Sequence, residues 1–389
     1  MNPPLKPRVL SCLVAIAALV IGGSVVTSTA TASQATRKAL VKSIDDVLAV
    51  KNSPPGISVL VTGNGRTQFF ARGKGNLATG AAPKLNEHFR IASVAKAFSG
   101  AVALSLVRKG KLKLSDTIGK LLPGKLPKAN RVTLRQALHH TGGLPDYIKN
   151  DNFRKDFGSN LKRYFSPQQI IRYVKNTKLT HRPGSTYEYS DTDNIVVGLM
   201  AEKATGVSYK RLLKREVYRQ LNLTRTSLPS VIAMPRPFIR GYDIDPPNPP
   251  NDISEFVNPS SAWASGAIVS TLPDLGRFFR GYVGGKLFGK NLKHAQRRWT
   301  LGESQPPGPG RNEAGLGLFR YTSKCGVVYG HSGSFPGYRT FAASSADGKR
   351  SIAYMVNIQV TPKSDFPNGK KISALIRKSY VQAVCHAFG

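Results

Sequence analysis

The sequence predicts an α+β fold with one antiparallel β-sheet that is built from both ends of the chain and flanked by helices. Alternating apolar runs, which are typical of strands, lie within residues 57–70 and 327–356. Between them, about residues 104–280 carry mostly helix and loop signals. We therefore expect the two ends of the chain to close one sheet, with a mostly helical subdomain inserted between its strands.

The first segment has the features of an export signal. Two basic residues precede an apolar run over residues 9–26, and the small residues Ala30-Thr31-Ala32 provide a cleavage site. We expect residues 1–32 to be removed as a signal peptide and residues 33–389 to form one exported domain. The apolar run is close to membrane-spanning length, so an uncleaved anchor is the alternative.

The strand predictions rest on turn residues as well as on alternation. Residues 57–62 and 67–70 flank Gly63-Asn64-Gly65, and Asn-Gly between two such runs is a strong hairpin signal. Asp347-Gly348 separates two later runs in the same way. The elements expected nearer the C-terminus are strands at residues 327–329, 338–342 and 352–356 and a last helix over about residues 371–388.

Helix starts and stops recur in the middle of the chain. A helix is expected to begin at Thr133 and to end before Gly142-Gly143, and Ser166-Pro167 begins another with proline one place inside. The proline-rich stretches at residues 245–250 and 305–310 are expected to be loops.

A serine and a lysine lie one helical turn apart in Ser93-Val94-Ala95-Lys96. The apolar run that follows predicts a helix that ends at Gly110, so Ser93 and Lys96 share one helix face. Unpaired N–H groups and the positive dipole end in the first turn favour a developing alkoxide on Ser93. We expect apolar surroundings to lower the pKa of Lys96, whose amine would then take the serine proton. This pattern predicts acyl transfer.

Two further motifs follow in order, Tyr189-Ser190-Asp191 and His331-Ser332-Gly333. Together with Ser93-x-x-Lys96 they match the three motifs of serine β-lactamases and penicillin-recognising peptidases. The sequence resembles the branch of that family that contains class C β-lactamases and D-alanyl-D-alanine carboxypeptidases. The resemblance covers most of residues 33–389 and implies the β-lactamase/transpeptidase-like version of the fold.

The resemblance implies catalytic roles for Ser93, Lys96, Tyr189 and His331. Ser93 is the nucleophile, and either Lys96 or Tyr189 takes its proton. The phenolate of Tyr189 would be favoured by charge if Lys96 and a protonated His331 flank it. The backbone N–H groups of Ser93 and Ser334 are implied to form the oxyanion hole.

The resemblance also indicates residues that bind the substrate. Trp263 lies in a matching segment, and Gly333 is expected to let the substrate backbone approach the strand closely. Asp191 stands where the family more often has Asn, and an ionised carboxylate accepts hydrogen bonds without donating any. We therefore expect Asp191 to pair with Lys96 or to contact a cationic group of the substrate.

Carboxypeptidase relatives hold the substrate's terminal carboxylate with an arginine at the place where this chain has Phe319, next to Arg320. Neighbours on a strand face opposite ways, so Arg320 reaches the site only through a bulge. If it does not, an esterase or another amide hydrolase fits better.

The first functional prediction is an exported D-alanyl-D-alanine carboxypeptidase that acts on cell-wall peptides through an acyl-enzyme. The rival is a class C-like β-lactamase or an esterase that uses the same residues. A polyanion-binding wall protein without turnover is the alternative of another class.

Cys325 and Cys385 are the only cysteines of the expected exported part. Export permits a disulfide, which would pin the last helix against the sheet that carries His331. Two free buried thiols are the alternative.

The composition is strongly basic. The net charge is +36, and loss of the two basic residues in the signal leaves +34. Such a field attracts polyanions without specificity, so we expect the protein to bind anionic cell-wall polymers through its basic surface. We also expect it to be a monomer. No motif indicates specific nucleic-acid binding, a cofactor or a metal site.

Overall fold

The computed structural model describes residue 1 and residues 24–389 apart from residue 64. The expected signal segment therefore lies mostly outside the described residues, as does the Asn64 position of the expected hairpin turn. Within the described part, no helix is long and apolar enough to cross a membrane.

An antiparallel sheet of eight strands forms the middle layer, in the order β2-β1-β12-β11-β10-β9-β8-β7. Pairing of β1 with β12, for example Val59 opposite Tyr354, joins the two ends of the chain. The fold class expected from the sequence is confirmed. The strands are β1 (Gly56–Gly63), β2 (Arg66–Gly73), β7 (Thr300–Leu301), β8 (Arg311–Gly315), β9 (Leu318–Ser323), β10 (Gly326–Phe335), β11 (Tyr338–Ser344) and β12 (Ser351–Val356), with short pairs β3 (Phe89–Arg90)–β6 (Val269–Ser270) and β4 (Tyr242–Asp243)–β5 (Asn251–Asp252) outside this sheet.

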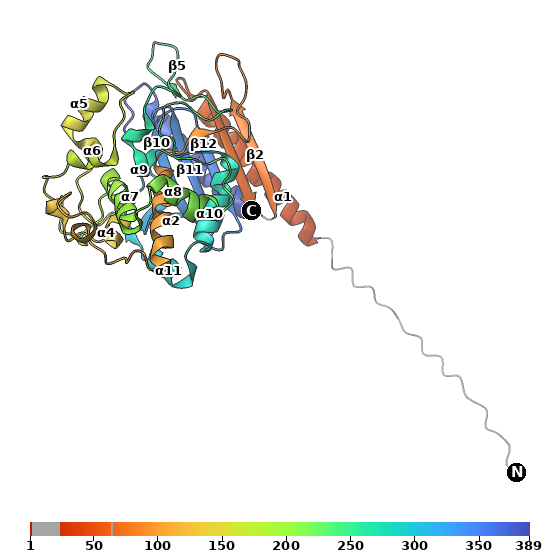
Figure 1. The fold of residues 1–389 in the computed structure, drawn as a ribbon. Coiled ribbons are helices and arrows are strands. Elements are labelled where there is room, and N and C mark those ends of the chain that lie inside the picture. The colour runs from red at the N-terminus through yellow and green to blue at the C-terminus, as the bar shows by residue number, and fades with distance from the viewer. Residues whose placement is uncertain (2–23, 64) are drawn as a thin grey trace.

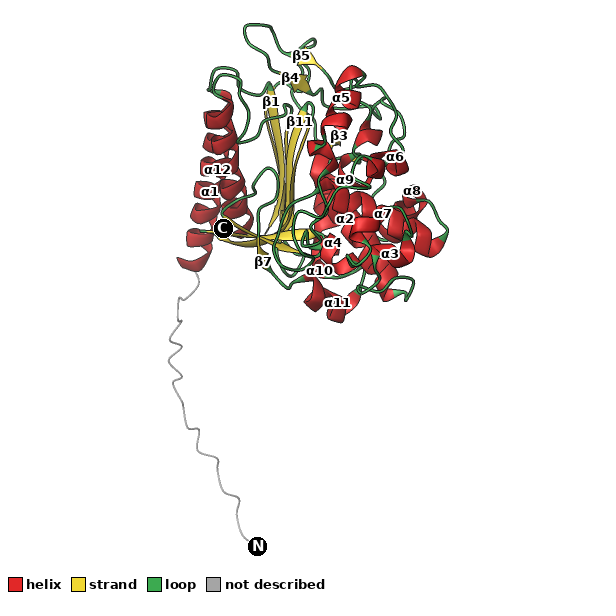
Figure 2. Cartoon of the chain, turned by 90° about the vertical axis from the view of Figure 1, so that its left-hand side faces the viewer, coloured by secondary structure: helices red, strands yellow, loops and turns green. Residues whose placement is uncertain are grey.

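Helices cover both faces of the sheet (Figure 2). On one face, α1 (Ser24–Leu48) and α12 (Gly369–Phe388) pack side by side, and their apolar residues share a core with the strands. The other face carries the helical region (Figure 1), which consists of α2 (Ala95–Arg108), α3 (Ile118–Leu121), α4 (Leu134–Leu138), α5 (Asp151–Ser159), α6 (Pro167–Arg172), α7 (Asp191–Thr205), α8 (Tyr209–Leu212), α9 (Trp263–Gly266), α10 (Leu272–Gly284) and α11 (Gly289–Gln296), and of the shorter or irregular turns η1 (Ala92–Val94), η2 (Pro127–Ala129), η3 (Tyr147–Lys149), η4 (Leu213–Tyr218) and η5 (Pro259–Ser261).

Helix α2 runs through the centre of the molecule, and every residue from Ala95 to Leu106 is buried. Its small side chains permit this position: a Cβ on Gly100 would lie 2.7 Å from the hydroxyl of Tyr282 and 2.9 Å from Cα of Gly317. A lysine near the start of this helix is consequently held inside the protein, where its ammonium needs polar partners.

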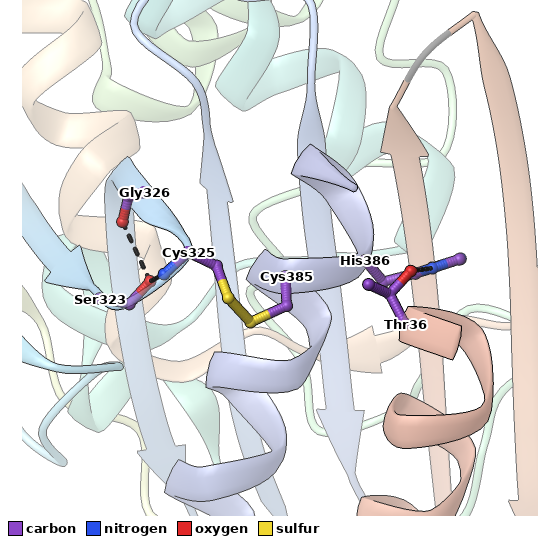
Figure 3. Close-up of a disulfide and its surroundings, with 6 residues drawn as sticks. All are labelled: Thr36, Ser323, Cys325, Gly326, Cys385 and His386. Carbon is purple, nitrogen blue, oxygen red and sulfur yellow. Dashed lines mark hydrogen bonds between the residues drawn. A yellow bond between two sulfur atoms is a disulfide. The ribbon is translucent and has the colours of Figure 1, made fainter. Parts of the chain in front are cut away.

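A disulfide between Cys325 and Cys385 ties the turn between β9 and β10 to α12 (Figure 3). This is the pairing that the sequence predicts. Close to it, the hydroxyl of Thr36 on α1 lies 3.0 Å from Nδ1 of His386 on α12. Both contacts fix the two terminal helices to each other and to the sheet.

Candidate active site

Ser93 lies in the η1 turn that directly precedes α2. The preceding residue, Ala92, has a φ of 53°, a left-handed conformation that strains a residue with a side chain by about 1–3 kcal/mol. The surrounding sheet holds this turn in place: the hydroxyl of Thr340 on β11 donates to the carbonyl of Ile91 at 2.8 Å. The strained turn therefore presents Ser93 in a fixed position between sheet and helix.

Gly333 on β10 packs against this turn. A Cβ at Gly333 would lie 2.8 Å from the Cβ of Ala92, from the carbonyl oxygen of Ile91 and from the nitrogen of Ser93. The expected role, space for a substrate backbone, is therefore not what the neighbours of Gly333 indicate. The missing side chain lets the strand approach the nucleophile's own turn.

Lys96 is buried, with 1% of its surface exposed, and its ammonium has three partners. Its Nζ lies 3.0 Å from Oγ of Ser93, 2.6 Å from Oδ1 of Asp191 and 3.0 Å from the carbonyl oxygen of Ser265. The expectation of apolar surroundings is wrong, because these oxygens satisfy the ammonium group. Of the two expectations for Asp191, the pairing with Lys96 is the one that the structure contains.

Asp191 is the first residue of α7 and belongs to a pair of neighbouring carboxyl groups. Its backbone N–H donates to Oδ1 of Asp146 at 3.2 Å. Burial raises the pKa of Asp146 to about 7, and the negative charge of Asp191 acts in the same direction. One carboxyl group, that of Asp191, thus contacts the ammonium, and a second, that of Asp146, lies next to it and titrates near neutral pH.

Tyr189 lies beside Lys96, whose Nζ is 5.1 Å from the centre of the tyrosine ring. Burial raises the pKa of Tyr189 well above its usual value, and the charge of Asp191 adds to this, while the nearby hydroxyl of Ser93 acts in the opposite direction. The phenolate expected from two flanking cations is therefore not favoured, and Tyr189 is a phenol. Its hydroxyl has no hydrogen bond of standard geometry to any described residue.

His331 on β10 lies behind Tyr189, with the two ring centres 6.3 Å apart. Burial lowers the pKa of His331 well below its usual value, and the charge of Lys96 lowers it further. The imidazole is therefore neutral, which explains why it does not act as the second cation beside Tyr189. Its Nδ1 lies 2.5 Å from the carbonyl oxygen of Ser332, and its Nε2 has no partner among the described residues.

A cavity of about 400 Å³ opens beside Ser93. Four residues predicted from the sequence share its wall, namely Ser93, Tyr189, Asp191 and Ser334. Lys96, Gly333 and His331 lie behind this wall rather than in it. The full lining is Ser93, Ile148, Tyr189, Asp191, Glu303, Ser304, Gln305, Pro306, Pro307, Ser334, Gln359, Thr361, Pro362 and Lys363.

Trp263 does not line this cavity, contrary to the prediction. Its ring packs 5.0 Å from that of Tyr209, and it fills the space that Gly198 leaves on α7. Gly198 leaves room for the indole, so the half-buried Trp263 packs against α7 and not in the cavity wall.

Phe319 and Arg320 on β9 do not reach the cavity either. Phe319 is buried with its ring 5.1 Å from that of His331. Arg320 stands opposite Glu313 in the β8–β9 register, and its Nε donates to Oε2 of Glu313 at 2.7 Å. There is no bulge at this point of the ladder, so Arg320 keeps the direction that strand alternation gives it.

Two loops of the cavity wall were not predicted to be part of the site. Residues 303–307 lie over β10, where the hydroxyl of Ser332 donates to the carbonyl oxygen of Pro306. Residues 359–363 follow β12 and contribute Lys363. The prolines of the first segment mark a loop in the sequence, but no local signal says against which strand that loop folds.

No group of three or more His, Cys, Asp or Glu side chains that could hold a metal ion occurs among the described residues.

Comparisons with known proteins identify a sequence family, curated relatives and solved structures with a similar fold. The sequence profile of the family described as Beta-lactamase matches residues 38–375. Protein flp of Staphylococcus aureus (strain COL) is 24% identical over 347 residues, which are 86% of this chain and 64% of that protein. Penicillin-binding protein 4* of Bacillus subtilis (strain 168) is 26% identical over 289 residues, covering 70% of this chain and 61% of that protein. The chain thus spans less than two thirds of the length of these relatives.

Two solved structures are similar along nearly their whole length. The D-stereospecific amidohydrolase from Streptomyces sp. has a TM-score of 0.73 and 26% identity, covering 84% of this chain and 94% of that one. The D-amino acid amidase from Ochrobactrum anthropi SV3, complexed with L-phenylalanine amide, has a TM-score of 0.77 and 22% identity, with 90% and 98% covered. The second likeness is one of fold alone.

Proposed function

The chain belongs to the beta-lactamase family, and from this premise we propose that it is a serine hydrolase that acts through an acyl-enzyme on Ser93. The observation that carries the proposal is the 3.0 Å contact between Nζ of Lys96 and Oγ of Ser93, with Ser93 in the wall of a cavity. A hydroxyl with an amine in hydrogen-bond reach and open space beside it has the arrangement that nucleophilic catalysis requires.

The proposed reaction has two steps. Oγ of Ser93 attacks the substrate carbonyl, the bond to the leaving amine or alcohol breaks, and the serine proton ends on the leaving group. Either Lys96 takes that proton as a neutral amine, or Tyr189 takes it while its own phenolic proton passes to the leaving group. As a phenol in the cavity wall, Tyr189 is suited to donate to the leaving group. Water then hydrolyses the ester on Ser93.

The proposed oxyanion hole consists of the backbone N–H groups of Ser93 and Ser334. Its support is that both residues line the cavity and that Gly333, which precedes Ser334, packs directly on the nitrogen of Ser93. A single donor of this kind contributes roughly 3 kcal/mol to stabilising the transition state.

We propose small amides or esters of D-amino acids as the substrates. The position of Arg320 supports this, because its ion pair with Glu313 leaves it unavailable for a substrate carboxylate. A solved structure with 26% identity is that of a D-stereospecific amidohydrolase. An esterase or amide hydrolase that needs no terminal carboxylate fits such a site.

A D-alanyl-D-alanine carboxypeptidase is the second candidate, and one observation favours it. Lys363 lies in the cavity wall, is exposed, and forms no ion pair with any described residue. A lysine at this place could attract a terminal carboxylate in place of the missing arginine.

A substrate panel separates these candidates. The purified protein is incubated with D-phenylalanine amide, its L-enantiomer, a peptide ending in D-Ala-D-Ala, the same peptide with an amidated C-terminus, and a chromogenic cephalosporin. We expect release of ammonia from the D-amide. Cleavage of only the free-carboxylate peptide would favour the carboxypeptidase, and turnover of only the cephalosporin a β-lactamase. No turnover of any compound, together with no covalent adduct on Ser93, would contradict the proposal.

We further propose that the protein is exported, acts as a monomer and associates with anionic cell-wall polymers. The signal-like N-terminal sequence supports export, and the net charge of +36 supports association with anionic polymers.

A further inference from the structure

A buried histidine–aspartate pair lies next to Tyr189 and outside the cavity wall. His140 follows α4 with a φ of 55°, and Asp193 lies in the first turn of α7. Nδ1 of His140 is 2.8 Å from Oδ2 of Asp193, and the two side chains are 5% and 1% exposed. A left-handed histidine that is buried against an aspartate is strained and desolvated, so the surrounding structure must hold it there.

His140 contacts the segment of Tyr189 with its ring, with its carbonyl oxygen and with its Nδ1, which lies 3.5 Å from the backbone nitrogen of Ser190. Its ring stacks on that of Tyr189 with the centres 4.8 Å apart and 29° between the planes. Its carbonyl oxygen accepts from the N–H of Glu188 at 2.8 Å, directly before Tyr189. Since the hydroxyl of Tyr189 makes no standard hydrogen bond with the described residues, its direction depends on such packing.

Burial acts against a charge on both members of the pair. Burial lowers the pKa of His140 to about 3, and the charge of Lys96 adds to this. Burial also raises the pKa of Asp193 well above its usual value. Both shifts favour the uncharged forms of the imidazole and the carboxyl group, which limits the charge that the pair places beside the ring of Tyr189.

We propose that His140 and Asp193 form a positioning pair that holds the phenol of Tyr189 in place for proton transfer in the reaction of Ser93. The inference rests on the proposed function, since it concerns the rate of acylation of Ser93. His140 contacts neither the cavity nor Ser93, and acts through Tyr189. Asp193 acts through His140, whose ring orientation it fixes.

The test separates the rate of the reaction at Ser93 from binding of the probe, a fluorophosphonate, which phosphonylates the serine and releases fluoride. A fluorescent fluorophosphonate is reacted with wild type, His140→Asn, Asp193→Asn, His140→Phe and the double variant His140→Asn/Asp193→Asn, and the rate is measured against probe concentration. We expect His140→Asn to lower the limiting rate of phosphonylation of Ser93 by about 10- to 100-fold, with less than about 3-fold change in the half-saturating concentration. His140→Phe should recover part of the rate, because it keeps a ring against Tyr189. The double variant should be no slower than His140→Asn, since the two residues act as a unit.

Ser105→Ala is the matched control. It removes a buried hydrogen bond to Glu216, at 2.7 Å, within the helical region and away from the cavity. Thermal melts give the folded fraction of each variant, and each rate is divided by that fraction. A loss of stability alone therefore leaves the corrected rate unchanged. Wild-type labelling of Ser93 with unchanged rates in folded His140→Asn and Asp193→Asn would overturn the pair and leave the proposed function standing. Equal losses in Ser105→Ala would also overturn it. Absence of labelling in wild type would instead refute the proposed function.

Discussion

At the scale of single residues, the chemistry of the site depends on how one buried ammonium is neutralised. Lys96 donates to Ser93, to Asp191 and to the carbonyl oxygen of Ser265. Asp146 lies behind Asp191, so two carboxyl groups and one amine share a small volume. The protonation of Asp146 therefore decides whether this group of three has no net charge or a negative one.

This arrangement predicts a pH dependence of stability. The pKa of Asp146 is raised to about 7 in the folded protein, against roughly 3.9 in an unfolded chain. Between these values the folded state binds more protons, so the free energy of unfolding falls as pH rises. Asp146→Asn keeps an acceptor for the N–H of Asp191 but does not titrate. The free energy of unfolding of this variant should therefore fall less than that of the wild type as pH rises. Urea unfolding of both proteins at pH 5 and pH 8 measures this, and an identical fall in both would contradict the assignment.

Some site residues could be predicted from the sequence and others could not, for a physical reason. Ser93, Tyr189, Asp191 and Ser334 come from the motifs and share one cavity wall. The direction of Arg320 depends instead on strand pairing, which places Glu313 opposite it, and a single sequence does not reveal that partner.

The pair of His140 and Asp193 shows the same limit. Both residues are visible in the sequence, but their contact requires the packing of α4 against α7, which brings together positions 53 apart. The spacing of the adjacent residues His139 and His140 is not that of metal ligands, which argues against a simple metal site. It does not indicate which residue of another helix either side chain contacts.

At the scale of elements, the position of Ser93 depends on β10 approaching the η1 turn. Gly333 makes this approach possible, since a Cβ there would lie 2.8 Å from three atoms of the turn. Backbone atoms cannot move aside as a flexible side chain can, so strand and turn would have to separate.

Gly333→Ala should therefore displace the nucleophile. We expect a loss of roughly 1–3 kcal/mol in the free energy of unfolding, as is typical of overpacking, and a marked loss of acylation of Ser93. Gly158→Ala on α5 is the matched control, because its Cβ would meet nothing within 4 Å. That variant should be as stable as wild type or more so, by up to about 1 kcal/mol. Normal acylation in Gly333→Ala would show that the close packing is not needed.

The elements themselves were predictable where local signals are strong. The Asn-Gly signal in the sequence predicts the hairpin of β1 and β2, whose register pairs Thr62 with Thr67. Helix α1 was not predicted as part of the fold. Its residues from Leu40 onward pack on α12, a contact between the two ends of the chain that no local pattern encodes.

At the scale of the whole molecule, the dominant feature is an excess of positive charge. Lysines and arginines number 57 against 21 acidic residues, which leaves +34 without the expected signal. Most of these charges are on the surface, whereas Ser93, Lys96 and Tyr189 belong to a largely buried site. Surface charge and catalytic chemistry should therefore respond differently to salt.

Binding to anionic polymers or anionic vesicles should fall steeply as salt is raised, because exposed charges are screened over about 8 Å at physiological ionic strength. Hydrolysis of a small neutral substrate should change far less over the same range. Co-sedimentation and an activity assay in one salt series measure both quantities. Binding that persists at high salt, or that is absent at low salt, would contradict a role for the basic surface in long-range attraction.

The central claim is that Ser93 forms a covalent acyl-enzyme. The most direct measurement is mass spectrometry of the intact protein and its peptides after incubation with a penicillin and, separately, with a fluorophosphonate. We predict one adduct per chain, located on the peptide that contains Ser93, and none in a Ser93→Ala variant with an unchanged thermal melt. An adduct that persists in folded Ser93→Ala, or that maps to another residue of the wild type, would contradict the claim.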